Sequence, residues 1–557
     1  MMRPSPHRLH QFVFVSWVCA LLSLIGALVA QGLAAIKGAT DATIPQQSNF
    51  YQYTFNRFEP FSLYLDAAFF LGLSFLLMRR SPAASTLARI FNSRHLPLLA
   101  ALAVFATTGA GRFAVHQNFD LCIDEYLNEF EVRILDQHHL VATLPEEWRE
   151  DENALKLPYV QYNEDQGYWA SGFLPGFASL DYLFDSAGLG WALGPVLAAL
   201  SILLIARLAE RAFPDQAGLA AGIAVLLLAF SPQFLAMAMT KFAWTAHLCG
   251  SLFWVWLFTH PRRLLFLLTP LVGVMLIGLH QPHVHLLVAA PFLLRLIYTR
   301  DWKAVGWFGS CYLAGGWAWY QVMLMLRPVS HGQVGDLHDF SFPFILSLVI
   351  TTFHALTLLA WCTPVLVPLL FLQVWTWKKQ PPLIRDSILA AGLTFLFYLS
   401  FPHEQGHGWG YRYMQSVYGL LALAAAGGAV ALVREGWSGA TLKALLASVI
   451  FSAAIQIPYR IHEIRAMVTP LSLASRYIES QKSDFVIVQT SEFWYSWDLI
   501  RNDPWLKEKP LVFDGTKLSP AQLAALSGKG SVTVIGAKEV KSFGVIISDP
   551  AKTLPAP

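Results

Sequence analysis

Long runs of apolar residues, separated by short polar connections, dominate the chain from residue 12 to residue 457. Many of the runs reach the ~20 residues that a helix needs to cross ~30 Å of hydrocarbon. The runs lie at 12–36, 60–78, 96–110, 186–206, 217–236, 243–259, 264–279, 286–299, 305–326, 344–376, 386–402, 413–433 and 440–457. They lack the alternation of barrel strands, and only helices and closed barrels satisfy their backbone hydrogen bonds in lipid. The pattern predicts an α-helical polytopic membrane protein with about 13 transmembrane helices.

Two of the runs allow a second interpretation. Residues 1–36 resemble a cleaved signal peptide in their basic start, but the run is longer than the apolar part of such a peptide, so we predict an uncleaved span. The run 344–376 is either one long span broken near Pro364 or two short ones. We prefer one span, because Lys378 and Lys379 then stay on the same side as the other basic clusters.

Composition supports this class and adds an orientation. The chain is 55% hydrophobic and only 13% charged, which excludes a soluble core of ordinary proportions. Most Lys and Arg clusters between the runs fall on one side of the membrane if the N-terminus is cytoplasmic. That arrangement places the loop 111–185 and the region after residue 457 outside the cytoplasm.

Three parts of the chain are polar enough to be soluble: a connector at 37–59, the loop 111–185 and the tail 458–557. The loop is strongly acidic. The tail predicts a small α/β domain, with strands at 484–489 and 510–513, a helix at 492–501, and a second helix that starts at Ser519 and Pro520. We therefore divide the chain into two N-terminal helices (1–95), a transmembrane module (96–457) and an extracytoplasmic accessory domain (458–557).

The segment that follows the third run carries the strongest chemical signal. Asp124 and Glu125 are adjacent, and apolar residues follow them with helical spacing from Tyr126 to Leu135, as in an amphipathic helix that lies on a membrane surface. Such a pair is often only a helix start, because acidic side chains favour the positive end of the helix dipole. A pair of carboxylates outside a membrane also fits acid–base chemistry.

This segment and three later ones resemble the GT-C glycosyltransferases, in particular the lipid A aminoarabinose transferases, protein O-mannosyltransferases and bacterial galacturonosyltransferases. The acidic pair followed by Tyr126 is similar to their first outer loop. The later matches, in chain order, are Gly172-Phe-Leu-Pro-Gly176, then Ser231-Pro232 with Thr240-Lys241 and Thr245-Ala-His247, and finally Gly408-Trp-Gly-Tyr-Arg-Tyr413. The resemblance covers about residues 96–435.

The resemblance implies a transferase that takes a sugar from a polyprenyl-phosphate donor and passes it to a lipid, glycan or protein acceptor. Asp124 would be the general base, with Glu125 second, and the anomeric centre would be inverted. The residues expected to bind the donor phosphate or the substrate are Lys241, His247, His283, Tyr411 and Arg412. The protein would be a multi-pass protein of a bacterial inner membrane with an extracytoplasmic site, and we expect no nucleic-acid partner.

Three of these binding residues also have a simpler role. Arg412 could be an interfacial anchor beside Tyr411, Lys241 another anchor, and His247 a neutral histidine that bonds between helices.

Two histidine groups could suggest a metal, because some GT-C enzymes use a divalent ion. In the group His280, His283 and His285 the helix is broken by Pro282, which leaves no fixed ligand face. The second group is His403, Glu404 and His407, and we predict no metal at either.

A transporter or flippase of lipid-linked glycans is the alternative function. Such a protein needs polar residues along several spans, whereas here most ionisable residues lie in the outer loops.

Overall fold

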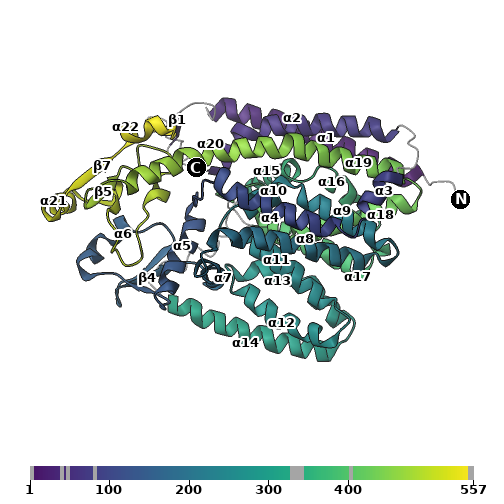
Figure 1. The fold of residues 1–557 in the computed structure, drawn as a ribbon, viewed down its shortest axis with the longest axis horizontal. Helices are drawn as coiled ribbons and strands as arrows, with labels where there is room; N and C mark the ends of the chain where they lie inside the picture. The colour runs from purple at the N-terminus through teal and green to yellow at the C-terminus, as the bar shows by residue number, and fades with distance from the viewer. Residues whose placement is uncertain are drawn as a thin grey trace.

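The computed structural model describes residues 6–37, 43–45, 50–78, 85–326, 344–400 and 405–549. Most long helices run along the long axis of the molecule, and the three-stranded sheets gather beyond one end of the helices (Figure 1). Within the described residues, each predicted apolar run consists mainly of helix. The helices of the apolar part are α1 (Pro6–Lys37), α2 (Phe50–Met78), α4 (Leu96–Ala114), α8 (Leu193–Ala212), α9 (Ala217–Ala229), α10 (Pro232–Ala238), α11 (Trp244–Phe258), α12 (Arg263–Ile277), α13 (Pro282–Tyr298), α14 (Trp302–Leu326), α15 (Phe344–Trp361), α16 (Leu366–Trp375), α17 (Pro382–Leu399), α18 (Gln415–Arg434) and α19 (Ser438–Phe451).

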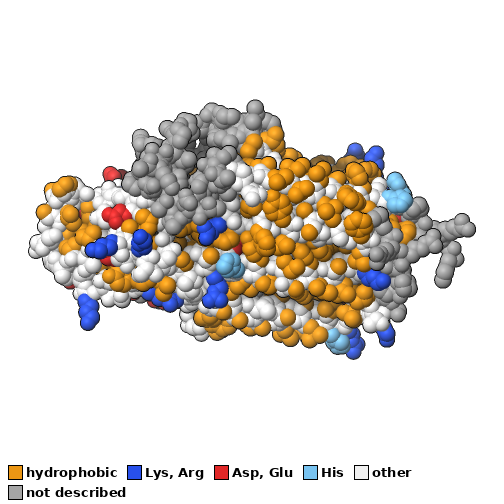
Figure 2. Space-filling view, turned by 90° about the horizontal axis from the view of Figure 1, so that it is seen from above, with side chains coloured by type: hydrophobic (Ala, Val, Ile, Leu, Met, Phe, Trp, Pro, Cys, Tyr) orange, Lys and Arg blue, Asp and Glu red, His pale blue; other side chains and the backbone are white. Residues whose placement is uncertain are grey.

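Within the described ranges, seven helices are long and apolar enough to cross a membrane, and the number rises to nine if two bent pairs each count as one span. Hydrophobic side chains spread over the helical part of the surface, with Lys and Arg mostly at its two ends (Figure 2). The chain is thus a multi-pass membrane protein, and the count of 13 spans stays a prediction.

The two bent pairs break where the sequence interrupts the apolar pattern. Helices α9 and α10 meet at 65° around Ser231, whose side chain accepts a hydrogen bond from the backbone N–H of Phe234 and caps α10. Helices α15 and α16 meet at 116°, so the run 344–376 is broken near Pro364 as predicted and is not one straight helix.

Helix α18 forms the centre of the helical part, since 89% of its most apolar stretch is buried. Its sequence is rich in Gly and Ala, which lets neighbouring backbones approach. A Cβ atom on Gly428 would lie 2.2 Å from the carbonyl oxygen of Leu369 in α16. This close packing fixes the C-terminal half of α18 against α16, while its first residue, Gln415, follows the turn that carries Arg412.

The acidic loop folds into helices and a small sheet. Helix α5 (Ile123–Asp136) starts one residue before Asp124, and α7 (Gly176–Asp185) packs near it. Strands β2 (Ala142–Thr143), β4 (Tyr168–Ser171) and β3 (Val160–Asn163) form an antiparallel sheet in the order β2-β4-β3. The helical spacing of this segment is confirmed, but its apolar side chains are buried against protein instead of facing a membrane surface.

The tail begins with a helix that continues from the membrane part. After α19 a π-helical turn (Ser452–Gln456) leads into α20 (Ile457–Glu479), so helix runs unbroken past residue 457. Strands β5 (Phe485–Val488), β6 (Leu511–Asp514) and β7 (Val532–Ile535) then form a parallel sheet in the order β6-β5-β7, and α21 (Pro520–Lys529) starts with the predicted Ser519 cap. The predicted helix at 492–501 is wrong, because only a 3₁₀ turn (Ser496–Leu499) forms there. The three-part division of the chain stays a prediction.

The tail is attached to both earlier soluble parts. Strand β8 (Ile547–Asp549) pairs in parallel with β1 (Thr43–Pro45) of the connector. Trp148 of the acidic loop lies edge-on to Phe485 and Phe513, with ring centroids 5.6 and 5.9 Å away. The loop and the tail therefore form one body beyond the end of the helices (Figure 1).

Candidate active site

Asp124 and Arg412 form an ion pair although 288 residues separate them in the chain. Nη1 of Arg412 lies 2.6 Å from Oδ2 of Asp124, and the two side chains are 8% and 14% exposed. Asp124 is on the first turn of α5, and Arg412 opens the short 3₁₀ turn (Arg412–Met414) before α18. The sequence predicted both residues as functional, and the fold brings them into contact.

Two glutamines hold the backbone around Arg412. Gln233 of α10 donates to the carbonyl oxygen of Tyr411 and accepts from its N–H, both at 3.0 Å. Gln405 donates to the carbonyl of Gly410 and accepts from the N–H of Arg412 at 3.1 Å. Gly410 has a positive φ of 65°, which glycine adopts without strain, and a Cβ there would collide with Gln233.

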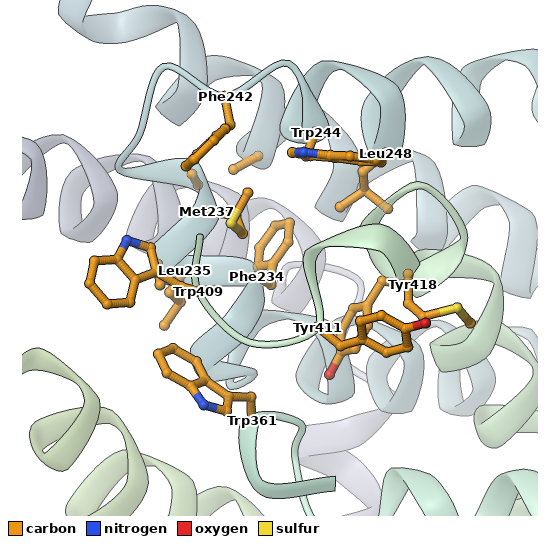
Figure 3. Close-up of a cluster of buried hydrophobic side chains, with 14 of the residues drawn as sticks. Phe234, Leu235, Met237, Phe242, Trp244, Leu248, Trp361, Trp409, Tyr411 and Tyr418 are labelled. Carbon is orange, nitrogen blue, oxygen red and sulfur yellow. The ribbon is translucent and has the colours of Figure 1, made fainter. Parts of the chain in front are cut away.

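Aromatic side chains surround this segment. Figure 3 shows Trp409, Tyr411, Phe234 and Trp361 in one buried cluster. Phe242, on the loop after α10, and Trp244, the first residue of α11, belong to the same cluster. The Arg412 guanidinium lies 5.3 Å from the ring centre of Phe242 and 5.4 Å from that of Tyr413, within range of cation–π attraction. Arg412 is therefore desolvated and fixed in direction.

The electrostatics of Asp124 depend on its partner. Burial alone would raise the pKa of this carboxyl, but the Arg412 guanidinium, helped by His407 and His280, holds the pKa below its ordinary value. Burial lowers the pKa of His407 itself to about 4. In this structure Asp124 is thus a carboxylate, and its basicity is suppressed by Arg412.

A narrow pocket of about 20 Å³ reaches Asp124, between α5 and the loops before α7 and α11. It is lined by Asp124, Leu127, Asn128, Glu131, Ser171, Phe173, Leu174, Phe177, Ala178, Phe242, Ala243, Trp244, Leu279 and His280. Its lining is mostly apolar, with Asp124 and His280 among the few titratable groups. A larger cleft of about 670 Å³ lies on the Tyr126 and Glu129 face of the same helix and extends to the tail.

Glu125 lines neither of these cavities and is fully buried. Its two carboxylate oxygens accept backbone N–H groups of Leu121 and Lys241, each at 3.1 Å. Burial raises the pKa of Glu125, and the nearby Asp120 adds to this effect. These contacts fix the start of α5 to the loop after α10, which is a structural task; a catalytic role for Glu125 stays a prediction.

Lys241 faces acidic residues and not Arg412. Its ammonium lies 2.6 Å from Glu129 and 3.6 Å from Asp181, and it lines the larger cleft. Burial would lower the pKa of Lys241, but Asp120, Glu129 and Asp181 raise it. Burial raises the pKa of Asp181 to about 6.

The other three predicted binding residues are largely buried among helices. Tyr411 stacks on His354 at 4.8 Å, and its side chain is fully buried. His283, at the start of α13, pairs with the hydroxyl of Tyr398 at 3.1 Å. His247 is buried in α11 beside Trp244, with ring centres 6.0 Å apart. None of these contacts tests their predicted roles.

The histidines of the first group contact different partners. His285 bonds to Tyr312, and His280 packs on Phe173. Within the described part of the chain, no group of three or more His, Cys, Asp or Glu side chains could hold a metal ion. His403 and Glu404 lie outside the described residues.

Sequence patterns could not reveal Gln233, Gln405 or the tail residue Asp498. Gln233 and Asp498 bond to the backbone of distant segments, and Gln405 bonds within its own irregular loop, so none of these bonds leaves a periodicity or motif in the sequence. Asp498 accepts from the N–H of Ile123, the first residue of α5, at 3.2 Å across 375 positions of sequence.

No protein-family model matches the sequence. No curated protein matches it either. The structure is similar to the crystal structure of ArnT from Cupriavidus metallidurans bound to undecaprenyl phosphate, with 13% sequence identity and a TM-score of 0.47 over 81% of this chain and 88% of that one. It is also similar to the same protein in the apo state, with 13% identity and a TM-score of 0.46 over 82% of this chain and 89% of that one. Both similarities extend over more than four fifths of this chain, at TM-scores below 0.5.

Proposed function

We propose that this chain is a membrane glycosyltransferase that moves a sugar from a polyprenyl-phosphate donor to a lipid, glycan or protein acceptor on the extracytoplasmic face. The observation that carries the proposal is the buried pair of Asp124 and Arg412. It joins the two groups that such a transfer needs, a carboxylate to take a proton and a guanidinium to hold a phosphate, at the point where the apolar helices meet the soluble part.

Arg412 is suited to the phosphate of the donor. A guanidinium forms short, charge-assisted hydrogen bonds to phosphate oxygens, and it stabilises the charge that develops as the phosphate leaves. Its Nε has no hydrogen-bond partner in the described chain, so it retains donor capacity beyond the bond to Asp124. Gln233 and Gln405 fix the backbone at Tyr411 and Arg412, so less conformational entropy is lost when Arg412 binds the phosphate.

Donor binding would also change Asp124. When the phosphate draws Arg412 away, the attraction to the guanidinium that lowers the pKa of Asp124 weakens, while burial, which raises the pKa, remains. Asp124 then becomes a stronger base at the moment when the donor is in place. The same residues thus couple the donor phosphate to proton removal from the acceptor.

The reaction would be a single displacement. The acceptor hydroxyl oxygen attacks the anomeric carbon, its proton passes to Asp124, and the bond between that carbon and the phosphate oxygen breaks. The electron pair leaves with the polyprenyl phosphate, held by Arg412. Attack from the face opposite the leaving group inverts the anomeric centre.

The test compares membranes that contain wild type, Asp124→Asn or Asp136→Asn, incubated with a panel of radiolabelled polyprenyl-phosphate sugars. Asp136 is the matched control, because it lies exposed at the far end of the same helix. We expect transfer by wild type and by Asp136→Asn, and a loss on the order of 10²- to 10⁴-fold for Asp124→Asn. If wild type consumes no donor, the enzyme proposal fails and transport of lipid-linked glycans becomes the function to test. If Asp124→Asn transfers as fast as wild type, the base assignment fails.

A further inference from the structure

The tail reaches the start of the helix that carries Asp124. Helix α5 begins at Ile123, and Cys122 before it provides no side-chain cap. The N–H groups at the start of a helix have no partner within the helix. Here the N–H of Ile123 donates to Oδ2 of Asp498, a residue of the tail. The cap that local sequence normally supplies comes from a residue 375 positions later in the chain.

Neighbouring tail residues bind the same turn. Arg501 donates to the carbonyl of Asp120 and lies over the rings of Phe119 and Tyr126, 4.2 and 5.0 Å from their centres. The hydroxyl of Tyr126 donates to the carbonyl of Asn502 at 3.1 Å. Residues on both sides of Asp124 are therefore attached to the tail between Asp498 and Asn502.

The same tail segment also contacts the loop that carries Arg412. The hydroxyl of Tyr495 pairs with Nε2 of His407 at 2.5 Å. Tyr495 adopts a positive φ of 68°, a conformation that a non-glycine residue holds only when its surroundings require it. The turn is fixed from within by Ser496, whose hydroxyl bonds to the carbonyls of Thr490 and Phe493.

From these contacts we propose that Asp498 is a positioning residue for Asp124: by capping α5 from the tail, it sets the direction of the carboxylate that receives the acceptor proton. The inference rests on the proposed function, since Asp124 is its catalytic base. It makes the tail a part of the active-site machinery and not only an accessory domain.

Variants at position 498 can keep or remove the hydrogen-bond acceptor for the Ile123 N–H while leaving the side chain about the same size. The residue is 1% exposed, and burial raises its pKa to about 8, so it is mostly neutral at pH 7. Asp498→Asn keeps the shape, the neutral state and an accepting oxygen. Asp498→Leu keeps the approximate size but cannot accept the Ile123 N–H. Asp514→Leu is the matched control, because Asp514 is also buried in the tail but bonds only to tail residues, namely Thr490, Thr516 and Lys517.

The experiment measures kcat and donor KM per folded protein for these three variants, in the assay that wild type and Asp124→Asn have already defined. For Asp498→Leu we expect kcat to fall on the order of 10- to 100-fold, because a small displacement of a catalytic group has effects of this size. Donor KM should stay within about twofold, since Arg412 is held by Gln233 and Gln405. Asp498→Asn should retain at least about half of the wild-type kcat, because an amide oxygen also caps a helix. Asp514→Leu should lose stability but keep its kcat per folded molecule.

The inference is overturned if Asp498→Leu has the wild-type kcat per folded protein, or if Asp514→Leu loses kcat to the same extent. It is also overturned if Asp498→Asn is as slow as Asp498→Leu, because the hydrogen-bond acceptor would then not be what matters. Failure of the proposed function looks different, since wild type itself would transfer no sugar.

Discussion

Replacing Arg412 with Gln removes one half of a buried ion pair and leaves Asp124 charged in a place with little water. The charges are held together by a hydrogen bond of 2.6 Å, and the side chains are 8% and 14% exposed. With charge centres ~4 Å apart and an effective dielectric constant of ~20, their attraction is about 4 kcal/mol. Losing one partner of such a pair costs about 3 to 5 kcal/mol, because the remaining charge stays buried. We expect a loss near the lower end, since Asp124 keeps some exposure.

The loss should depend on pH in a defined direction. In wild type the pKa of Asp124 is lowered, so the stability from the pair is complete above the ordinary value of about 4 and disappears as pH falls through the lowered value. In Arg412→Gln, burial is the main remaining influence and raises the pKa of Asp124 above that ordinary value. The variant therefore gains stability relative to wild type as pH falls from 8 toward 5, because Asp124 can then take up a proton.

The assay is the unfolding temperature of detergent-solubilised protein across pH 5 to 8 for wild type, Arg412→Gln, Asp124→Asn and the double variant. We expect the double variant to be more stable than Arg412→Gln at pH 8, with a coupling between the two positions of at least about 2 kcal/mol. A coupling below about 0.5 kcal/mol, or a destabilisation that is the same at pH 5 and pH 8, would refute the account of the pair.

Three further predictions concern neighbouring residues. In Glu125→Gln a single side-chain oxygen must serve two backbone N–H groups, so the variant should lose about 1 to 3 kcal/mol of stability, measured as a lower unfolding temperature. Its transfer rate per folded protein should stay within about threefold of wild type, and a loss of 10²-fold would instead make Glu125 the base. Gln233→Leu frees the backbone of Tyr411 and should raise donor KM by about tenfold in the transfer assay, and an unchanged KM would contradict the role of Gln233. Burial raises the pKa of Glu131 to about 7, so protonated Glu131 stabilises the fold below the pKa of the unfolded chain, and this stabilisation is lost as pH rises to about 7. Glu131→Gln should therefore remove up to about 1.4 kcal/mol of stability change per pH unit between pH 5 and 7, measured by unfolding temperature. An unchanged dependence of the unfolding temperature on pH would exclude Glu131 as the source of that change.

The membrane class and the position of each helix follow from the apolar runs, because lipid imposes a long, strong and local pattern on the sequence. The same holds for the break near Pro364, for the Ser519 cap and for the helix after Asp124. The predicted helix at 492–501 failed for a physical reason. Its polar groups serve other segments, since Tyr495 reaches His407 and Asp498 reaches Ile123, and those bonds favour a turn over a helix.

The candidate site was predictable as a set of residues but not as an arrangement. Asp124 and Arg412 stand out by type and by place in the chain, yet their contact depends on how α5 and α18 pack. Lys241 looked like a second phosphate ligand, but Glu129 and Asp181 surround it, and their proximity depends on the fold of the acidic loop. The interfacial interpretation of α5 failed because α7 and β4 of the acidic loop pack against the helix, and Tyr126 also bonds to Asn502 of the tail.

Because the ribosome makes the chain from its N-terminus, the Asp498 cap can form only near the end of synthesis. Ile123 and Asp498 are 375 positions apart, and at 5–20 residues per second the interval between their synthesis is roughly 20 to 75 s. Throughout this interval α5 lacks the residue that accepts its first N–H group, and for most of it Asp124 also lacks Arg412. A nascent chain in the membrane therefore holds no finished site, and the last segments to emerge determine when the protein becomes competent.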